Sequence, residues 1–153
     1  MTEIVHSDRG ASFQKPAAAS PVSYGARSTD AHVTYLRIYA DANGETHMQD
    51  VDIALLPMEI FKDNPPLRLS DTLAASGVSF CRVPSGRCDV DWHNPPRRML
   101  VIWLTGEVEF ETSDGDVRRV AAGGVVLAED TTGKGHISRH PPEGQLVLHV
   151  DLA

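Results

Sequence analysis

The second half of the chain alternates short β-rich segments with turn residues, and this pattern limits the fold more than any other feature. Turn signals such as Asn94-Pro95 and Gly123-Gly124 separate the segments. The predicted strands cover residues 78–83, 89–93, 98–105, 107–112, 116–120, 125–129, 135–140 and 145–152. No segment shows the long 3.6-residue period of an amphipathic helix. Many short strands at this spacing favour an all-β sandwich or closed barrel.

The first half is predicted to add a hairpin. Residues 32–39 are rich in β-formers, Asn43-Gly44 supplies turn chemistry, and residues 45–55 form the returning strand. Residues 57–70 are expected to form a loop or a short helix, followed by a helical turn over 71–76. Pro65-Pro66 would break the helix within the earlier of these two segments.

Residues 1–30 carry no apolar period and are predicted to form an irregular N-terminal arm. The arm either stays flexible or lies along the barrel or a partner subunit. Residues 31–153 are predicted to form one β-barrel domain, since 153 residues fit one domain better than two.

Charge and hydropathy exclude several classes of partner. The net charge of −7 leaves no basic stripe for phosphates, which argues against a nucleic-acid partner. Apolar runs such as 99–104 are far too short to cross a bilayer, so no membrane partner is expected. Residues 1–10 lack an apolar secretory stretch, and a cytoplasmic location is the expectation.

The segment 98–105 is apolar on both of its strand faces, because alternate residues of a strand point the same way. One face carries Met99, Val101 and Trp103, and the other carries Leu100, Ile102 and Leu104. This is the pattern of a central strand with one side toward the barrel interior. The other side is expected to pack on a second sheet or a second subunit, which favours a homodimer.

Polar side chains also share strand faces. His136, Ser138 and His140 fall on one face, Asp91 pairs with His93, and Gln145, Val147 and His149 fall together. Several side chains that could bind a ligand or a metal could therefore converge in one lumen. The sequence predicts a small-molecule pocket around His93 and His136.

These segments resemble the two motifs of the cupin family. Counting from His93, the pattern HxH(x)3E(x)6G places its second His slot on Pro95, its Glu slot on Met99 and its Gly slot on Gly106. Gly133-Lys134-Gly135-His136 fits the G(x)2H core of the second motif. The resemblance covers residues 77–152 and extends to small single-domain bacterial cupins. It implies a cupin-type double-stranded β-helix, or jelly-roll, barrel.

The departures from the cupin motifs bear on metal binding. Family members with a bound metal use the His and Glu slots that here hold His93, Pro95, Met99 and His136. Pro has no donor atom, and a thioether poorly replaces a carboxylate. Two alternatives stay open. One divalent transition metal is held by His93 and His136 with help from other side chains, or the two histidines are hydrogen-bonded pocket residues without an ion. The possible additional ligands are Asp91, His140, His149 and His47.

Metal-free chemistry fits the same residues. A neutral imidazole is suited to general acid/base work near neutral pH, so His93 and His136 are candidate catalytic groups. Arg97 or Arg98 could hold a carboxylate or phenolate, since a guanidinium offers a bidentate fork. Met99 and Trp103 would supply an apolar wall for the ligand. Asp130 is expected to cap the turn over 131–133.

Three hypotheses follow. The first is an enzyme acting on a small organic molecule: an isomerase, lyase or cyclase by acid/base chemistry, or a metal-dependent dioxygenase. The second is a small-molecule-binding cupin without turnover. The third is a structural barrel whose lumen is filled by Trp103, Met99 and their neighbours. The third predicts no cavity of roughly 300 Å³ or more, the size at which ligand pockets begin.

Overall fold

The computed structural model describes residues 20–22, 24, 27, 29–87 and 91–153. Within this range the chain is all-β. Its strands are β1 (His32–Ala40), β2 (Thr46–Ala54), β3 (Leu56–Met58), β4 (Leu67–Leu69), β5 (Ala75–Val83), β6 (Met99–Trp103), β7 (Glu107–Thr112), β8 (Val117–Ala121), β9 (Val125–Ala128), β10 (His136–Arg139) and β11 (Gln145–Leu152). The described residues form no helix of the length and apolarity that crossing a membrane requires.

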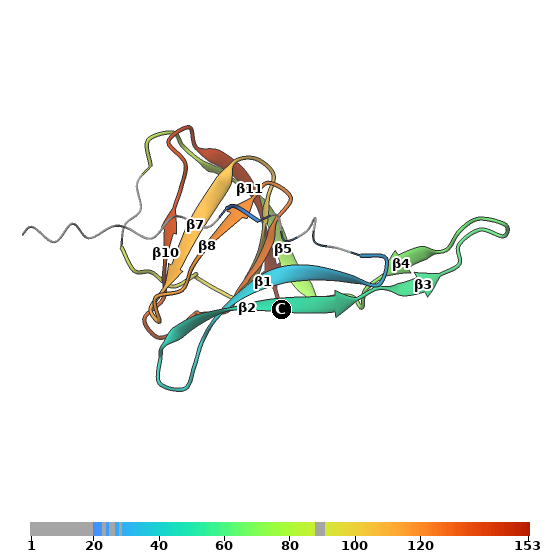
Figure 1. Ribbon diagram of the computed structural model, residues 1–153, viewed down its shortest axis with the longest axis horizontal. Helices are drawn as coiled ribbons and strands as arrows, with labels where there is room; N and C mark the ends of the chain where they lie inside the picture. Colours follow the sequence, from blue (N-terminus) through green and yellow to red (C-terminus); the bar gives the residue numbers. More distant parts are fainter. Residues whose placement is uncertain (1–19, 23, 25–26, 28, 88–90) are drawn as a thin grey trace, which may run out of the picture.

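The strands form two larger sheets and one small hairpin (Figure 1). The larger sheet is mixed and has the order β2-β1-β9-β6-β11-β5, with β1 and β9 parallel and its other pairs antiparallel. The second sheet is antiparallel, in the order β10-β7-β8. The hairpin of β3 and β4 extends away from both sheets.

The hydrophobic core lies between the two larger sheets. It combines Leu36 and Ile38 of β1 with Phe110 of β7 and Val120 of β8. Trp103 of β6 meets the Phe110 ring edge-on, with 5.6 Å between ring centroids. This geometry suits aromatic quadrupoles and ties the two sheets together.

Most predicted strands are confirmed, and two predictions are corrected. The loop alternative for residues 57–70 is confirmed over 59–66, but no helix forms there or over 71–76: Leu56–Met58 pairs with Leu67–Leu69, and β5 already begins at Ala75. Pro65-Pro66 falls in the loop of this hairpin, before β4 begins, so the backbone N–H groups that prolines lack are not needed for strand pairing. The strand expected over 89–93 is not continuous. His93 forms only an isolated bridge to His136, and residues 88–90 lie outside the described part.

The predicted N-terminal arm falls largely on residues outside the described part, namely 1–19, 23, 25, 26 and 28. Two of its described residues pack against the sheets. Val22 bridges Val120 of β8 in parallel, and Tyr24 is buried in the core. Val22 and Tyr24 therefore contribute to packing.

The β1–β2 turn is docked onto two other turns. His47 Nδ1 lies 2.7 Å from Asp114 Oδ2 in the β7–β8 turn, and Nε2 lies 3.5 Å from Asp41 Oδ2. The Lys134 amide donates to the Gly44 carbonyl at 3.0 Å. His47 thus lies among turn carboxylates and does not line the pocket that contains His136.

The ion pairs of His47 predict a pH-dependent stability. The hydrogen bond with Asp114 raises the pKa of His47 against the opposing effect of burial, and Asp41 adds to the increase. A raised folded-state pKa means that the stabilisation is complete below the ordinary value of 6.5. It is lost as the pH rises through the pKa of the folded protein. We expect the stability gap between wild type and His47→Asn, measured by urea unfolding, to shrink between acidic and alkaline pH.

His32→Asn is the matched control, because its ring bonds the Thr29 hydroxyl rather than a carboxylate. Its stability gap to wild type should not follow the His47 pattern. A His47→Asn gap that stays constant across this pH range would contradict the role given to the Asp114 pair.

Candidate functional site

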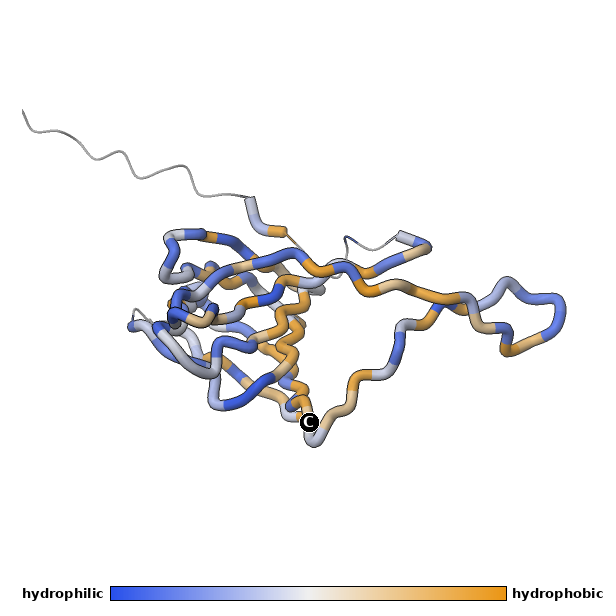
Figure 2. The backbone as a smooth tube through the Cα atoms, turned by 90° about the horizontal axis from the view of Figure 1, so that it is seen from below, coloured by the Kyte–Doolittle hydropathy of each residue, from blue (hydrophilic) through white to orange (hydrophobic). Residues whose placement is uncertain are grey.

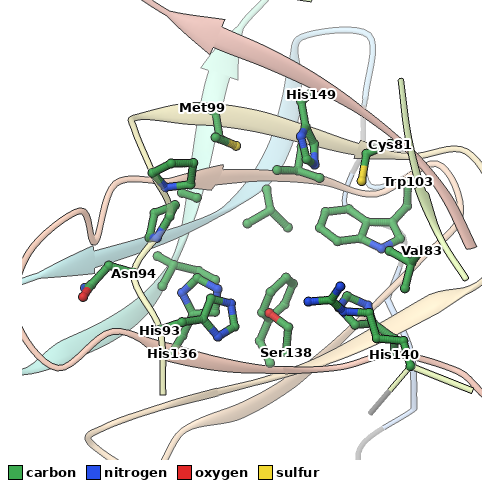
Figure 3. Close-up of a pocket in the computed structure, with 18 of the residues that line it drawn as sticks. Cys81, Val83, His93, Asn94, Met99, Trp103, His136, Ser138, His140 and His149 are labelled. Atoms are coloured by element: carbon green, nitrogen blue, oxygen red, sulfur yellow. The ribbon is translucent and has the colours of Figure 1, made fainter. Parts of the chain in front are cut away.

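A pocket of about 370 Å³ lies between the two larger sheets (Figure 3). Its lining is mainly apolar, with polar groups concentrated among the histidines. The lining residues are Ile38, Cys81, Arg82, Val83, Arg87, His93, Asn94, Pro95, Pro96, Met99, Val101, Trp103, Phe110, Val126, Ala128, His136, Ser138, His140 and His149. The volume is that of a small ligand site, which argues against a filled structural lumen.

Two strand-like hydrogen bonds bring His93 and His136 together. The His93 amide donates to the His136 carbonyl at 3.0 Å, and the His136 amide donates to the His93 carbonyl at 2.9 Å. The two rings meet edge-on with 4.7 Å between centroids. Figure 3 shows them side by side on one wall of the pocket. Residues 43 positions apart thus form one paired group.

Gly135 makes this approach possible. It has a φ of +74°, and a Cβ built at this position would lie 2.3 Å from the His93 carbonyl oxygen. Only a residue without a side chain fits such a contact and this left-handed backbone. The glycine next to His136 is therefore part of the site geometry.

A hydrogen bond from the His136 ring to Asp130 fixes the orientation of that ring. Asp130 is fully buried, and its Oδ2 lies 2.7 Å from His136 Nδ1. An ionised carboxylate only accepts hydrogen bonds, so Nδ1–H of His136 donates this bond, and in the neutral imidazole the lone pair is then on Nε2. We refer to Asp130 and His136 as the dyad. The Asp130 carbonyl accepts from Asn94 Nδ2 at 2.7 Å, which links the dyad to the neighbour of His93 in the chain. The turn-capping role expected for Asp130 is wrong: Oδ2 bonds the His136 ring, and Oδ1 has no hydrogen-bond partner among the described residues.

His140 is fixed on another side of the pocket. The Gln145 side-chain oxygen accepts from His140 Nδ1 at 2.7 Å and from Trp103 Nε1 at 3.2 Å, while its amide nitrogen donates to the Glu107 carbonyl at 2.8 Å. Gln145 is buried, and these bonds satisfy both of its polar atoms. One glutamine therefore orients two pocket side chains.

His149 completes a set of four histidines on the pocket wall. It projects from β11, where its register partner on β6 is the pocket residue Val101. Burial lowers the pKa of His149, against the opposing charge of Asp151. The neutral imidazole is thus favoured at this position, as suits an otherwise apolar wall.

The structure brings together six of the predicted site residues and leaves two outside. The pocket residues are His93, Met99, Trp103, His136, His140 and His149. Arg97 does not line the pocket, and its Nη1 pairs with Asp151 Oδ2 at 2.9 Å. The Asp91 side chain is not part of the lining either, although its carbonyl accepts from His93 Nδ1 at 3.0 Å.

Sequence reasoning missed the pocket residues on β5 and in its neighbourhood. Cys81, Arg82 and Val83 of β5 line the pocket, as do Arg87 and Asn94. Strand alternation within β5 places Cys81 and Val83 on the inner face, and Cys81 pairs with the core residue Val147. That register could have indicated Cys81, but only once the pairing of β5 with β11 was known.

The described residues do not fit a tight metal site. In the ranges 29–87 and 91–153 no three side chains of His, Cys, Asp or Glu gather as a ligand group. His93 and His136 lie close together, but their pair lacks a third ligand among the described residues. Two imidazoles alone bind a divalent ion weakly, so no chemical step is assigned to a metal.

Comparison with known proteins adds no assignment to this geometry. No family model matches the sequence, and no curated protein matches it. The chemistry must therefore be argued from the pocket itself.

Gly135→Ala is predicted to damage both stability and the His93–His136 pair. A left-handed alanine costs about 1–2 kcal/mol, and the contact with the His93 carbonyl adds to it. Gly115→Ala is the matched control, since Gly115 has a φ of +89° but nothing within 4 Å of a built Cβ. Urea unfolding should show a clearly larger loss for Gly135→Ala. Equal losses would mean that the close approach at Gly135 is unimportant.

Proposed function

We propose that the protein is an enzyme that moves a proton within a small, mainly apolar organic molecule, by acid/base chemistry in the pocket. The observation that carries the proposal is the buried Asp130–His136 dyad beside His93 on the wall of a ligand-sized pocket. The reaction class is isomerisation, elimination or cyclisation. These reactions share one initial step, the removal of a proton from the substrate.

His136 is the proposed general base. Nδ1–H donates to Asp130, so the lone pair on Nε2 is available to take a proton from a carbon next to a carbonyl group. The C–H bond breaks, an N–H bond forms, and the electron pair moves onto the carbonyl as an enolate. Asp130 stabilises the resulting imidazolium and keeps its ring in one tautomer, as a carboxylate partner does in other dyads.

His93 is the proposed second proton carrier. Its ring lies edge-on to His136, so both rings can reach one small substrate. Return of a proton to a neighbouring atom gives an isomer, and protonation of a departing group gives an elimination product. In each case the proton taken from the substrate is held on His136 Nε2, and it returns to the product directly or through His93, so one proton leaves the substrate and one is given back.

The remaining wall fits the substrate class. Ile38, Val101 and Val126 give an apolar floor, and Trp103 and Phe110 give aromatic surface. Such surfaces exclude water and strengthen electrostatic effects at the reacting atoms.

We further propose that the barrel is a cupin-type jelly roll. Two observations support this. A six-stranded and a three-stranded sheet enclose the core, and the two histidines in the cupin motif positions, His93 and His136, meet at one pocket. The proposed acid/base activity does not depend on this family assignment, because it rests on the dyad.

The dyad predicts the effect of substitutions on proton exchange. In D₂O, we expect the wild type to catalyse deuterium incorporation into at least one of a panel of short oxo acids and cyclic enones, followed by proton NMR. His136→Gln should lower the exchange rate by about 10²–10⁴-fold, the usual contribution of a general base. Asp130→Asn should also lower it and change its pH profile, because the tautomer is no longer fixed.

His47→Gln is the matched control, since His47 lies among turn carboxylates and not in the pocket. It should exchange deuterium at the wild-type rate. A wild type that binds panel members in a thermal-shift assay but exchanges none of them would favour the alternative, a ligand-binding protein without turnover.

A further inference from the structure

The exposed apolar surface of the chain is concentrated in one stretch. Among the described residues, nine of the twelve large exposed apolar side chains fall between positions 56 and 80. They are Leu56, Met58, Ile60, Phe61, Leu67, Leu69, Leu73, Val78 and Phe80. We refer to residues 56–73 as the apolar arm. It includes β3 and β4 and projects away from the barrel (Figure 2).

The arm joins the two opposite edges of the six-stranded sheet. The chain leaves this sheet at β2 on one edge and re-enters it at β5 on the other. The hairpin has only three residues in each strand, and every residue of both strands is exposed. A two-stranded hairpin of this kind is marginally stable alone, and it gains stability when a further surface covers its apolar side chains.

The outer face of the six-stranded sheet is a second apolar surface. Opposite residues of paired strands share a face, so the pairs Ile102–Val125, Ile102–Leu148 and Leu148–Phe80 form one continuous row. Leu127, Leu100, Val150 and Val78 form a parallel row. Leu127 is buried, and the other members of both rows are half-buried or exposed. The first row ends at the free edge of β5 with Phe80, which is 73% exposed.

The area of the exposed stretch matches what a stable dimer requires. An aromatic side chain carries about 150–250 Å², and the aliphatic side chains in this set are smaller, so a half-exposed one leaves at most about 100 Å² in water. The nine side chains together give at most roughly 900 Å², against about 800 Å² per partner in a standard interface. Monomeric proteins rarely expose an apolar patch of more than about 600 Å².

Charge and symmetry favour a second copy of the chain as the partner. Residues 56–80 carry three acidic and two basic side chains, so their net charge of about −1 opposes self-association little. The whole chain has a net charge of −7, which disfavours an anionic membrane surface. A two-fold axis places the same two surfaces of each copy against each other, and here one chain offers both an arm and a receiving face.

We propose that two copies of the chain associate about a two-fold axis, with the apolar arm of each copy packed on the outer face of the other copy's six-stranded sheet. Homodimer interfaces are more apolar than other protein surfaces, as this one is. The association covers the free edge of β5, which a monomer would leave open to uncontrolled strand pairing. It also covers the half-buried outer rows on β6, β9 and β11.

Sedimentation and hydrogen exchange on the full chain test the proposal. Over about 1–100 µM, where a standard interface is populated, we expect a species of twice the 16.6 kDa chain mass.

Phe61→Asp in the arm and Phe80→Asp on the face should each raise the dimer dissociation constant at least about tenfold, which is the cost of a lost apolar anchor. Amides in residues 56–73 should lose protection as the dimer is diluted. Val117→Asp is the matched control, because Val117 is exposed on β8 in the other sheet.

Mixing the two variants tests the reciprocal geometry. One arm and one receiving face stay intact in a dimer of Phe61→Asp with Phe80→Asp, so the mixture should dimerise at concentrations where neither variant does alone. A chain that stays monomeric throughout the range, with or without phosphatidylcholine vesicles, would overturn the proposal. So would a dimer that Val117→Asp weakens as much as the two arm and face variants do.

Discussion

Two backbone hydrogen bonds between His93 and His136 are the constraint on which the rest of the site depends. They attach the irregular segment before β6 to the start of β10, and they bring two imidazoles from distant parts of the chain to one wall. The close contact at Gly135 permits this bridge. Asp130 and Asn94 then fix the two sides of the bridge to each other, so the geometry of the proposed base is set by backbone before any ligand binds.

Strand alternation allowed much of this to be predicted from the sequence. His136, Ser138 and His140 share a face in β10 and at its end, and all three line the pocket. Strand bounds such as Glu107–Thr112 and Gln145–Leu152 are confirmed because long β-rich runs between turn residues fix both ends. In these elements a period of two residues determines which side chains point inward.

The rest could not be predicted, because it depends on loops and on strand pairing. Asp130 lies between strands, where no periodicity gives the direction of a side chain. The three-residue strands of the arm are too short to show any period, and their apolar residues resemble those of a broken helix. Arg97 follows a proline pair at the strand mouth, and only the position of Asp151 on β11 shows that it turns away from the pocket.

Successive side chains of a strand point to opposite faces of the six-stranded sheet. The pocket lies on the inner face of this sheet and the apolar rows lie on its outer face. In β6, Val101 lines the pocket while Leu100 and Ile102 lie in the outer rows. A single strand thus belongs to both surfaces. Thermodynamic linkage then makes the two binding events reciprocal. If association of two copies changes the ligand dissociation constant by some factor, ligand binding changes the dimer dissociation constant by the same factor.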